Sequence, residues 1–162
     1  YNNSDKELKK VIKNVANTKT NEVYALAKLK IIDLAHKGDK NPVKTFVKKY
    51  GKSRYFKEVV NNIKKVLRLK NQNHIKVVKK FGKACSYPGR FMGSIHAIIT
   101  SPNYKSAVTK TIKAGGCNCS RANFTGAYFA ASKGVKTIPI QWIKKTKPAK
   151  LIISHQKNLI NI

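Results

Sequence analysis

The sequence predicts an all-α fold, a bundle of several helices without a β-sheet. Apolar residues recur three and four positions apart through most of the 162 residues, the spacing that places them along one face of a helix. Nowhere does the alternation of apolar and polar residues typical of a half-buried strand persist. The 41% of hydrophobic side chains suffices for the core of one compact unit, and no linker or internal repeat divides residues 1–162. We therefore expect a single helical domain.

Two helices are expected before residue 38. Ser4 and Glu7 have the spacing of a capping box, so the first helix is expected to begin near Asp5. Thr20 is the expected cap of the second helix, and Gly38 provides the stop after it. The apolar stripes of the two helices are Leu8, Val11, Ile12, Val15 and Ala16, and then Val23, Ala27, Ile31, Leu34 and Ala35.

Three further helices are expected between residues 42 and 82. Pro42 suits the first turn of a short helix that ends at Gly51. Ser53 is expected to begin the next helix, which has the clearest amphipathic pattern in the chain. A shorter helix from Asn73 ends at Gly82. Their apolar stripes are Val43, Phe46, Val47 and Tyr50; Phe56, Val59, Val60, Ile63, Val66 and Leu67; and Ile75, Val78 and Phe81.

Turn residues separate the remaining helices. Residues 86–90 (SYPGR) predict a loop, and helical spacing then resumes until Ser101-Pro102 interrupts it. The next helix is expected to end at Gly115-Gly116, and a helix with small residues four apart follows. Residues 147–162 are expected to form a peripheral tail. The stripes of these helices are Phe91, Ile95, Ile98 and Ile99; Tyr104, Val108 and Ile112; and Ala122, Gly126 and Ala130. The residues expected to be mostly buried are Val59, Ile63, Leu67, Ile95, Ile99, Val108 and Ala130.

Charge is the most unusual property of the sequence. The 35 Lys and Arg residues against 6 Asp and Glu give a formal net charge of +29. Such a charge attracts polyanions, and its self-repulsion destabilises the compact state at low salt. The lysines are nevertheless spread evenly along the chain, and Lys, Asn and Ile are over-used together. Mutational or codon bias therefore explains the charge without any binding role, and non-specific polyanion binding is the alternative.

Acidic residues and cysteines limit the possible chemistry. Residues 59–162 contain no Asp or Glu, so no carboxylate can act from that part of the chain. The cysteines are Cys85, Cys117 and Cys119, too few and too oddly spaced for a disulfide framework. Reduced thiols are therefore expected, with Cys85 as a small buried apolar side chain.

The sequence has no targeting or membrane signal. No run approaches the roughly 20 apolar residues of a membrane span, and the first residues lack the pattern of a signal peptide. A soluble, cytoplasmic protein without membrane contact is expected. Since the chain begins at Tyr1 and its one methionine is Met92, we expect it to be a fragment of a longer protein.

Residues 114–122 (AGGCNCSRA) form the most informative stretch. Two glycines before a helix give a turn whose following N–H groups point outward, which suits an anion or a metal-bound group. Cys117 and Cys119 could instead be half of a zinc site. That alternative is weakly supported, because Cys85 is the one other thiol, the histidines lack finger spacing, and a structural zinc needs four ligands.

The order and spacing of several motifs resemble the C-terminal half of ADP-ribosylglycohydrolases, and most of all the branch that contains the J-type crystallins of the eye lens. The resemblance implies an all-α bundle of the ADP-ribosylglycohydrolase type, incomplete at its N-terminus in this chain. It covers roughly residues 80–146, and Val23 to Gly38 also looks like a family helix. The motifs are residues 81–91 (FGKACSYPGRF), 95–98 (IHAI), 114–121 (AGGCNCSR), 126–127 (GA), 138–139 (IP) and 142–146 (WIKKT).

The resemblance implies a site for two magnesium ions, held between acidic motifs near the N-terminus and a late signature, Gly-Gly-Asp-x-Asp followed by Thr or Ser. Position by position, Cys117 stands in the place of the first Asp, Cys119 in that of the second, and Ser120 in that of the hydroxyl ligand. The crystallin branch resembles this chain at Cys119 but not at Cys117. Magnesium prefers hard oxygen ligands, so of these three only Ser120 is a suitable donor. With the N-terminal acidic motifs also absent, no tightly bound magnesium is expected.

By the same resemblance, Ser86, Tyr87 and Gly89 line the ADP-ribose pocket, with Gly89 allowing close approach and Tyr87 offering a face for stacking. An ordinary helix connection is the alternative for this loop. His96 is expected to be a core residue, or one behind the site, and Trp142 a packing anchor.

Three hypotheses for function follow. The chain is part of an ADP-ribosylglycohydrolase that acts on ADP-ribosylated substrates; or it is a crystallin-like relative with a structural role; or it binds nucleic acid through its basic surface, which no recognised module supports. The resemblance favours an ADP-ribosylglycohydrolase-like protein, and Cys117 indicates that this chain is inactive as it stands. Its catalytic residues are unknown.

Overall fold

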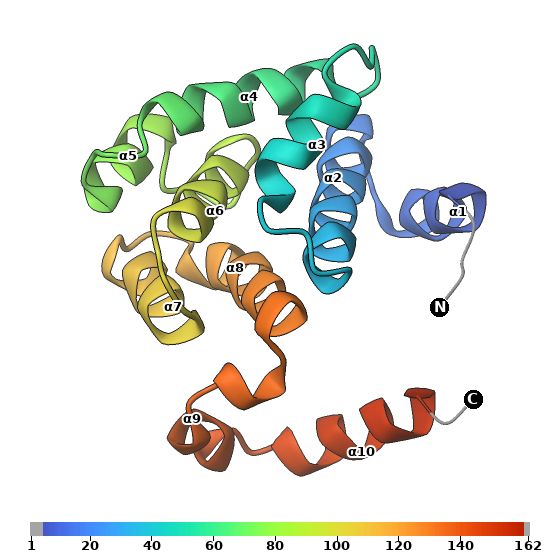
Figure 1. The fold of residues 1–162 in the computed structure, drawn as a ribbon, viewed down its shortest axis with the longest axis vertical. Coiled ribbons are helices and arrows are strands. Elements are labelled where there is room, and N and C mark those ends of the chain that lie inside the picture. Colours follow the sequence, from blue (N-terminus) through green and yellow to red (C-terminus); the bar gives the residue numbers. More distant parts are fainter. Residues whose placement is uncertain (1–4, 161–162) are drawn as a thin grey trace.

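The computed structural model describes residues 5–160 of the chain, and the side chains of residues 7–155. Within this range the chain forms ten α-helices, one short 3-10 helix and no strand, which confirms the all-α class (Figure 1). Ser4 of the expected capping box lies outside the described residues. The helices are α1 Asp5–Val15, α2 Lys19–His36, α3 Pro42–Tyr50, α4 Lys57–Arg68, α5 His74–Phe81, α6 Gly89–Ile99, α7 Tyr104–Lys113, α8 Asn118–Lys133, η1 Val135–Thr137, α9 Ile140–Lys145 and α10 Ala149–Ile160.

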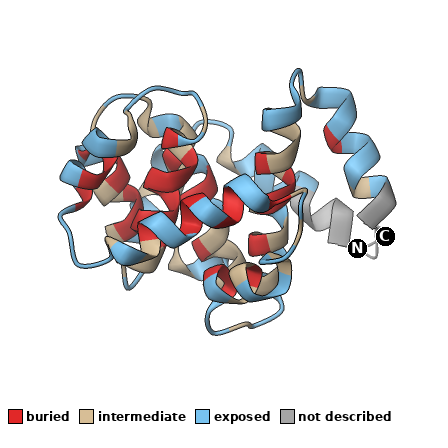
Figure 2. Cartoon of the chain, turned by 90° about the horizontal axis from the view of Figure 1, so that it is seen from above, coloured by how far each residue is buried: buried red, intermediate tan, exposed pale blue. Residues whose placement is uncertain are grey.

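Helix α6 lies at the centre of the bundle. Residues 91–98 (FMGSIHAI) are buried without interruption, which agrees with a sequence that carries no charged side chain on any face. Helices α4, α5, α7 and α8 pack around it. Figure 2 shows the buried residues concentrated in the bundle, with exposed residues on its periphery. A stretch of eight residues that is buried on every side has to be covered by several neighbours, so α6 organises the helices around it.

Aromatic rings connect the helices across the core. Phe91 of α6 packs edge-on against Tyr24 of α2 and is stacked on Phe124 of α8, with ring centroids 5.1 and 5.8 Å apart. Phe46 of α3 packs edge-on against Phe56, which precedes α4. Of the residues expected to be mostly buried, Val59, Ile63, Ile95 and Val108 are fully buried, and Leu67, Ile99 and Ala130 are partly buried.

Three helix starts differ from the prediction. The cap of α2 is Thr18, whose hydroxyl accepts a hydrogen bond from the Asn21 N–H, and not Thr20. Ser53 does not begin a helix. It lies in a turn and accepts a weak bond from the Phe56 N–H, so α4 begins only at Lys57. The expected loop at residues 86–90 is shorter, because α6 begins at Gly89.

The C-terminal helices lie at the margin of the molecule. In Figure 1, α9 and α10 extend away from the bundle formed by α2 to α8. Leu151 and Ile152 of α10 are 59% and 57% exposed. Trp142 of α9 makes an edge-on contact with Tyr104 at the start of α7, which agrees with its expected role as a packing anchor. No helix within residues 5–160 has both the length and the apolar character needed to cross a membrane.

Candidate functional site

The Gly-Gly turn between α7 and α8 lies directly against the segment that follows α5. Gly115 and Gly116 have φ angles of +69° and +63°, which side chains other than glycine rarely adopt. The N–H of Cys117 then donates to the Lys83 carbonyl at 2.8 Å. A Cβ on Gly116 would lie only 2.5 Å from that same carbonyl oxygen. Glycine is therefore required here both for the turn and for the close approach of two backbone segments.

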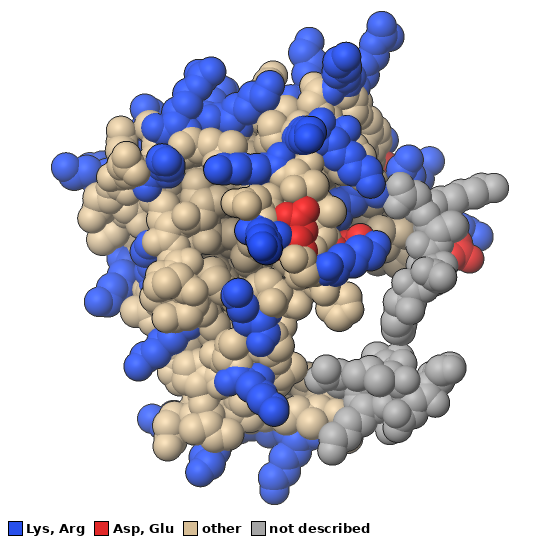
Figure 3. Space-filling view, in the orientation of Figure 1, with Lys and Arg blue, Asp and Glu red and all other residues tan. Residues whose placement is uncertain are grey.

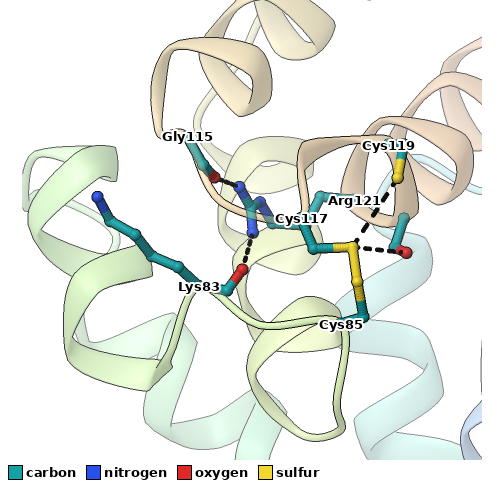
Figure 4. Close-up of a disulfide and its surroundings, with 7 residues drawn as sticks. Lys83, Cys85, Gly115, Cys117, Cys119 and Arg121 are labelled. Atoms are coloured by element: carbon teal, nitrogen blue, oxygen red, sulfur yellow. Dashed lines mark hydrogen bonds between the residues drawn. A yellow bond between two sulfur atoms is a disulfide. The ribbon is translucent and has the colours of Figure 1, made fainter.

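A disulfide joins these two segments (Figure 4). It links Cys85, in the turn between α5 and α6, to Cys117, the residue before α8, across 32 positions of sequence and a Cα–Cα distance of 5.2 Å. The expectation of three reduced cysteines is therefore wrong for this structure, as is the expectation that Cys85 is buried, because its side chain is exposed. Each cysteine belongs to a turn, and only the folded arrangement brings the two turns together.

Cys119 and Ser120 lie beside the disulfide on the first turn of α8. Cys119 is a free, exposed thiol whose sulfur lies 3.9 Å from that of Cys117. The Ser120 hydroxyl lies 3.0 Å from the Cys117 sulfur. Since a disulfide sulfur carries no proton, the hydroxyl is the donor in this contact. The three positions expected to correspond to family metal ligands thus form one cluster.

This cluster does not fit magnesium. Two of its three side chains end in sulfur, one of these sulfurs is already bonded to Cys85, and magnesium takes oxygen ligands. In the part of the chain that the structure describes, no three or more His, Cys, Asp or Glu side chains are grouped so that they could hold a metal ion. Ser120 remains the one oxygen donor of the three.

Arg121, which the sequence analysis did not single out, connects the two backbone segments of the site. It is fully buried, and its guanidinium donates to the carbonyls of Gly115 and Lys83, one from each of the two joined segments (Figure 4). Its Nε has no hydrogen-bond partner. Burial lowers the pKa of Arg121, while the neighbouring Cys119 opposes this shift. Arginine is rarely buried, so the sequence alone gave no reason to expect Arg121 in the core.

Close packing explains how such a large charged side chain is accommodated. A Cβ on Gly93 of α6 would lie 2.7 Å from the Arg121 Cδ. Ser94, one position further along α6, donates to the Arg90 carbonyl and lies within hydrogen-bonding distance of the Arg121 carbonyl, at 2.9 and 3.2 Å. The central helix therefore carries a groove of small residues in which Arg121 lies.

The loop expected to bind ADP-ribose is close to the same cluster, but Tyr87 is already stacked. Its ring lies parallel to that of Tyr24, with centroids 4.3 Å apart, and the Arg90 guanidinium lies 3.7 Å from its centroid. A flat ring has two faces, and these two neighbours cover both. Ser86 remains exposed, whereas Gly89 is buried, and a Cβ on Gly89 would meet the Phe81 carbonyl oxygen at 2.6 Å. Close approach at Gly89 thus serves the contact with α5.

Two cations flank the Tyr87 ring. Besides Arg90, the Lys28 ammonium lies 5.1 Å from the Tyr87 centroid and 5.5 Å from that of Phe124. Burial, together with the nearby charge of Arg90, lowers the pKa of Lys28 to about 8. On the other side of the stack, the Tyr24 hydroxyl donates to the Glu58 carboxylate at 2.8 Å. The sequence analysis did not predict this cluster, because a lysine on the apolar face of a helix, such as Lys28, is not a recognisable motif.

His96 belongs to a separate, buried histidine pair. Its Nδ1 lies 3.0 Å from the Nδ1 of His74, and its Nε2 lies 3.1 Å from the Leu69 carbonyl oxygen. A carbonyl only accepts, so His96 is protonated on Nε2, and His74 donates from its own Nδ1. The expectation that His96 is a core residue agrees with its complete burial. This pair lines a different pocket of about 670 Å³ between α5, α6 and α7.

Comparisons with known proteins agree with the resemblance. The family model described as ADP-ribosylglycohydrolase matches residues 9–160. Crystallin J1A of Tripedalia cystophora is 40% identical over 82 residues, which is 51% of this chain and 26% of that protein. Crystallin J1B of the same organism is 30% identical over 89 residues, 55% of this chain and 28% of that protein. The matches thus span about a quarter of the length of these curated relatives.

Proposed function

Because the chain belongs to the ADP-ribosylglycohydrolase family, we propose that it is an ADP-ribosylglycohydrolase-like protein that does not hydrolyse ADP-ribosyl bonds in its present form. The observation that carries this proposal is the disulfide at Cys117. By the resemblance to the family, this position corresponds to an Asp whose carboxylate binds magnesium. A sulfur that is bonded to Cys85 has neither the charge nor the hardness to replace it.

The absence of other carboxylates supports the same conclusion. Residues 59–162 contain no Asp or Glu that could take over from the missing ligand. Glu58, the nearest acid to the loop in sequence, is exposed and accepts a hydrogen bond from the Tyr24 hydroxyl. Residues 59–162 therefore offer no carboxylate that would hold a metal and position a water for attack on the ribosyl C1 bond.

The test is an assay for free ADP-ribose with an ADP-ribosylated protein as substrate, run with and without magnesium beside an active member of the family. We expect no release by this chain above the uncatalysed rate. Release that depends on magnesium would show that the argument from the missing carboxylates is wrong.

Binding of ADP-ribose is a separate part of the proposal. We propose that the exposed Ser86 and the cations Lys28 and Arg90 contact the ligand. The two cations would face its diphosphate, because residues 59–162 contain no Asp or Glu that would repel the phosphates. The variant Arg90→Gln should bind ADP-ribose at least about tenfold more weakly in calorimetry, because charge-assisted contacts to phosphate are among the stronger hydrogen bonds. Arg68→Gln, an equal change of charge at the exposed end of α4, is the control and should have no effect.

A structural role is the second candidate, and the names of the two crystallin relatives favour it. A crystallin-like protein has to remain monodisperse when concentrated, which a large net charge of one sign assists. Static light scattering with rising protein concentration tests this. Repulsive behaviour at physiological salt supports the structural role, and association into large particles contradicts it.

A further inference from the structure

The cysteines converge on one point of the surface. Cys85 and Cys117 are bonded to each other, and the sulfur of Cys119 lies 3.9 Å from that of Cys117 (Figure 4). These are all three cysteines of the chain. They come from two turns separated by 32 positions, so the fold, and not sequence proximity, brings the third sulfur to the C-x-C pair.

The spacing of the sulfurs matches that of a thiolate metal site. Zinc–sulfur bonds of about 2.3 Å at tetrahedral angles place two sulfurs of one site about 3.8 Å apart. The sulfurs of Cys117 and Cys119 already have this separation. Cys85 lies in an exposed turn, so its side chain has room to move from bonding distance to ligand distance once the disulfide is reduced.

The surroundings suit thiolates better than any other metal ligand. The guanidinium of the buried Arg121 lies beside the turn that carries Cys117, where it donates to the Gly115 and Lys83 carbonyls. No carboxylate of residues 59–162 competes for the metal, and the Ser120 hydroxyl, 3.0 Å from the Cys117 sulfur, is adjacent as a further oxygen donor. Soft thiolate ligands select zinc and its heavier relatives and reject magnesium.

We propose that Cys85, Cys117 and Cys119 form, when reduced, a binding site for a thiophilic divalent cation such as zinc or cadmium, with water or Ser120 as the fourth ligand. The disulfide and the metal site are alternative states of the same sulfurs. The proposed site lies where the resemblance to the family implies a magnesium site, but its ligands are soft thiolates in place of hard oxygens.

Conversion between the two states requires a reductant. A tertiary phosphine takes the oxygen of one water molecule to become a phosphine oxide, and the two hydrogens of that water complete the thiols of Cys85 and Cys117. The metal then displaces the protons of three thiols as three metal–sulfur bonds form. Cys119 is exposed, so the cation can reach the site from solvent.

The test is a cadmium titration of the whole chain after reduction by the phosphine and its removal under inert gas. The cadmium–thiolate charge-transfer band in the ultraviolet should rise to one metal per chain, with three protons released, and zinc should abolish it in competition. Magnesium in large excess should leave the band unchanged. The oxidised chain should give no band, because two of the three sulfurs are then bonded to each other.

Single substitutions establish that three sulfurs take part. Cys85→Ser and Cys119→Ser should each weaken cadmium binding by at least about tenfold, the smallest loss expected when a metal site is damaged. Asn118→Ser, between Cys117 and Cys119, is the matched control and should bind as the unmodified chain does. Far-ultraviolet circular dichroism checks the helices of each reduced protein.

Three results would overturn the proposal. The first is unchanged affinity in Cys119→Ser, which would reduce the site to two sulfurs. The second is one metal per two chains, which would place the site between molecules. The third is a reduced chain that gives no thiolate band, whether it remains helical or unfolds. Recovery of helicity on adding cadmium to a reduced, unfolded chain would instead support the proposal.

Discussion

At the scale of single residues, Arg121 is the least expected feature of the molecule. A fully buried guanidinium normally has a carboxylate partner, and this part of the chain contains none. Its partners are two carbonyls, of Gly115 and Lys83, that belong to the two segments joined by the disulfide. Arg121 therefore positions the Gly-Gly turn, and the turn in turn positions Cys117.

Replacing Arg121 should destabilise the fold. Arg121→Ala leaves a cavity beneath Gly93 and removes the donors to two carbonyls, which together should lower the free energy of unfolding by roughly 3 kcal/mol. Chemical denaturation followed by circular dichroism measures this change. Arg68→Ala, at the exposed end of α4, is the control, with an expected change within about 0.5 kcal/mol. Equal stabilities of the two variants would contradict the positioning role of Arg121.

The buried histidine pair should make stability depend on pH. Burial, together with His96, Lys110 and Arg121, lowers the pKa of His74 to about 3, below its usual value of 6.5. Below pH 6.5 the unfolded chain therefore binds a proton that the folded chain excludes. The stabilisation is complete above pH 6.5 and is lost as the pH falls towards 3, at up to about 1.4 kcal/mol per pH unit.

Denaturation at several pH values between about 7 and 4 tests this prediction. His74→Gln should have a flatter pH profile, because the titrating group is gone. His36→Gln, at the exposed end of α2, should keep the profile of the unmodified chain. A profile that is the same in all three proteins would show that His74 does not cause the acid sensitivity.

At the scale of helices, the spacing of apolar residues predicted well which residues of a helix are buried, and less well the residue at which a helix begins. The stripe of α4 and the apolar run of α6 predicted which residues are buried, because burial of a face is a property of the whole element. The start of a helix depends instead on one side chain in one conformation. Thr20 was the expected cap of α2, whereas the backbone conformation at Thr18 makes the Thr18 hydroxyl the acceptor for the Asn21 N–H.

This difference can be measured. Thr18→Ala should lower the free energy of unfolding by about 1 kcal/mol, since it removes the acceptor for the Asn21 N–H at the start of α2. Thr20→Ala, two positions later in the first turn, should be close to neutral, because its side chain is not the cap. A larger loss in Thr20→Ala than in Thr18→Ala would contradict the observed start of α2.

The candidate site could be predicted only in part from the sequence. The Gly-Gly turn and the cluster of Cys117, Cys119 and Ser120 follow from local spacing. The disulfide to Cys85 does not, because loop conformation and helix packing decide which distant residues meet. The stacking of Tyr87 between Tyr24 and Arg90 is likewise a tertiary contact that no local pattern encodes.

At the scale of the whole molecule, charge dominates the surface. Figure 3 shows Lys and Arg side chains over much of the visible face, and only a few acidic side chains, which lie at separate places from the middle to the right of the view. On this face the positive charge is therefore spread out and not focused into one groove. Such a surface contacts phosphates without reading bases.

Any binding to DNA or RNA should accordingly be non-specific and sensitive to salt. The logarithm of the binding constant should fall with the logarithm of salt concentration by about 0.9 per phosphate contact. Fluorescence anisotropy with two unrelated oligonucleotides and a polyglutamate of equal charge measures this, and all three ligands should behave alike. Retained affinity at about 0.5 M salt, or a preference for one sequence, would indicate a specific site instead.

The final prediction concerns the whole active centre and depends on Cys117. In this chain Cys117→Asp should not produce hydrolysis, because the acidic motifs expected on the other side of a two-metal centre are absent and half a site cannot close around its metals. In a longer chain that carries those motifs, the same substitution should raise magnesium affinity and the release of ADP-ribose together. Cys117→Ser is the matched control, since it also breaks the disulfide but supplies no carboxylate. If Cys117→Ser restores hydrolysis as well as Cys117→Asp does, the disulfide and not the missing carboxylate is the block. If neither does so in the longer chain, the inactivity has a cause beyond this one ligand.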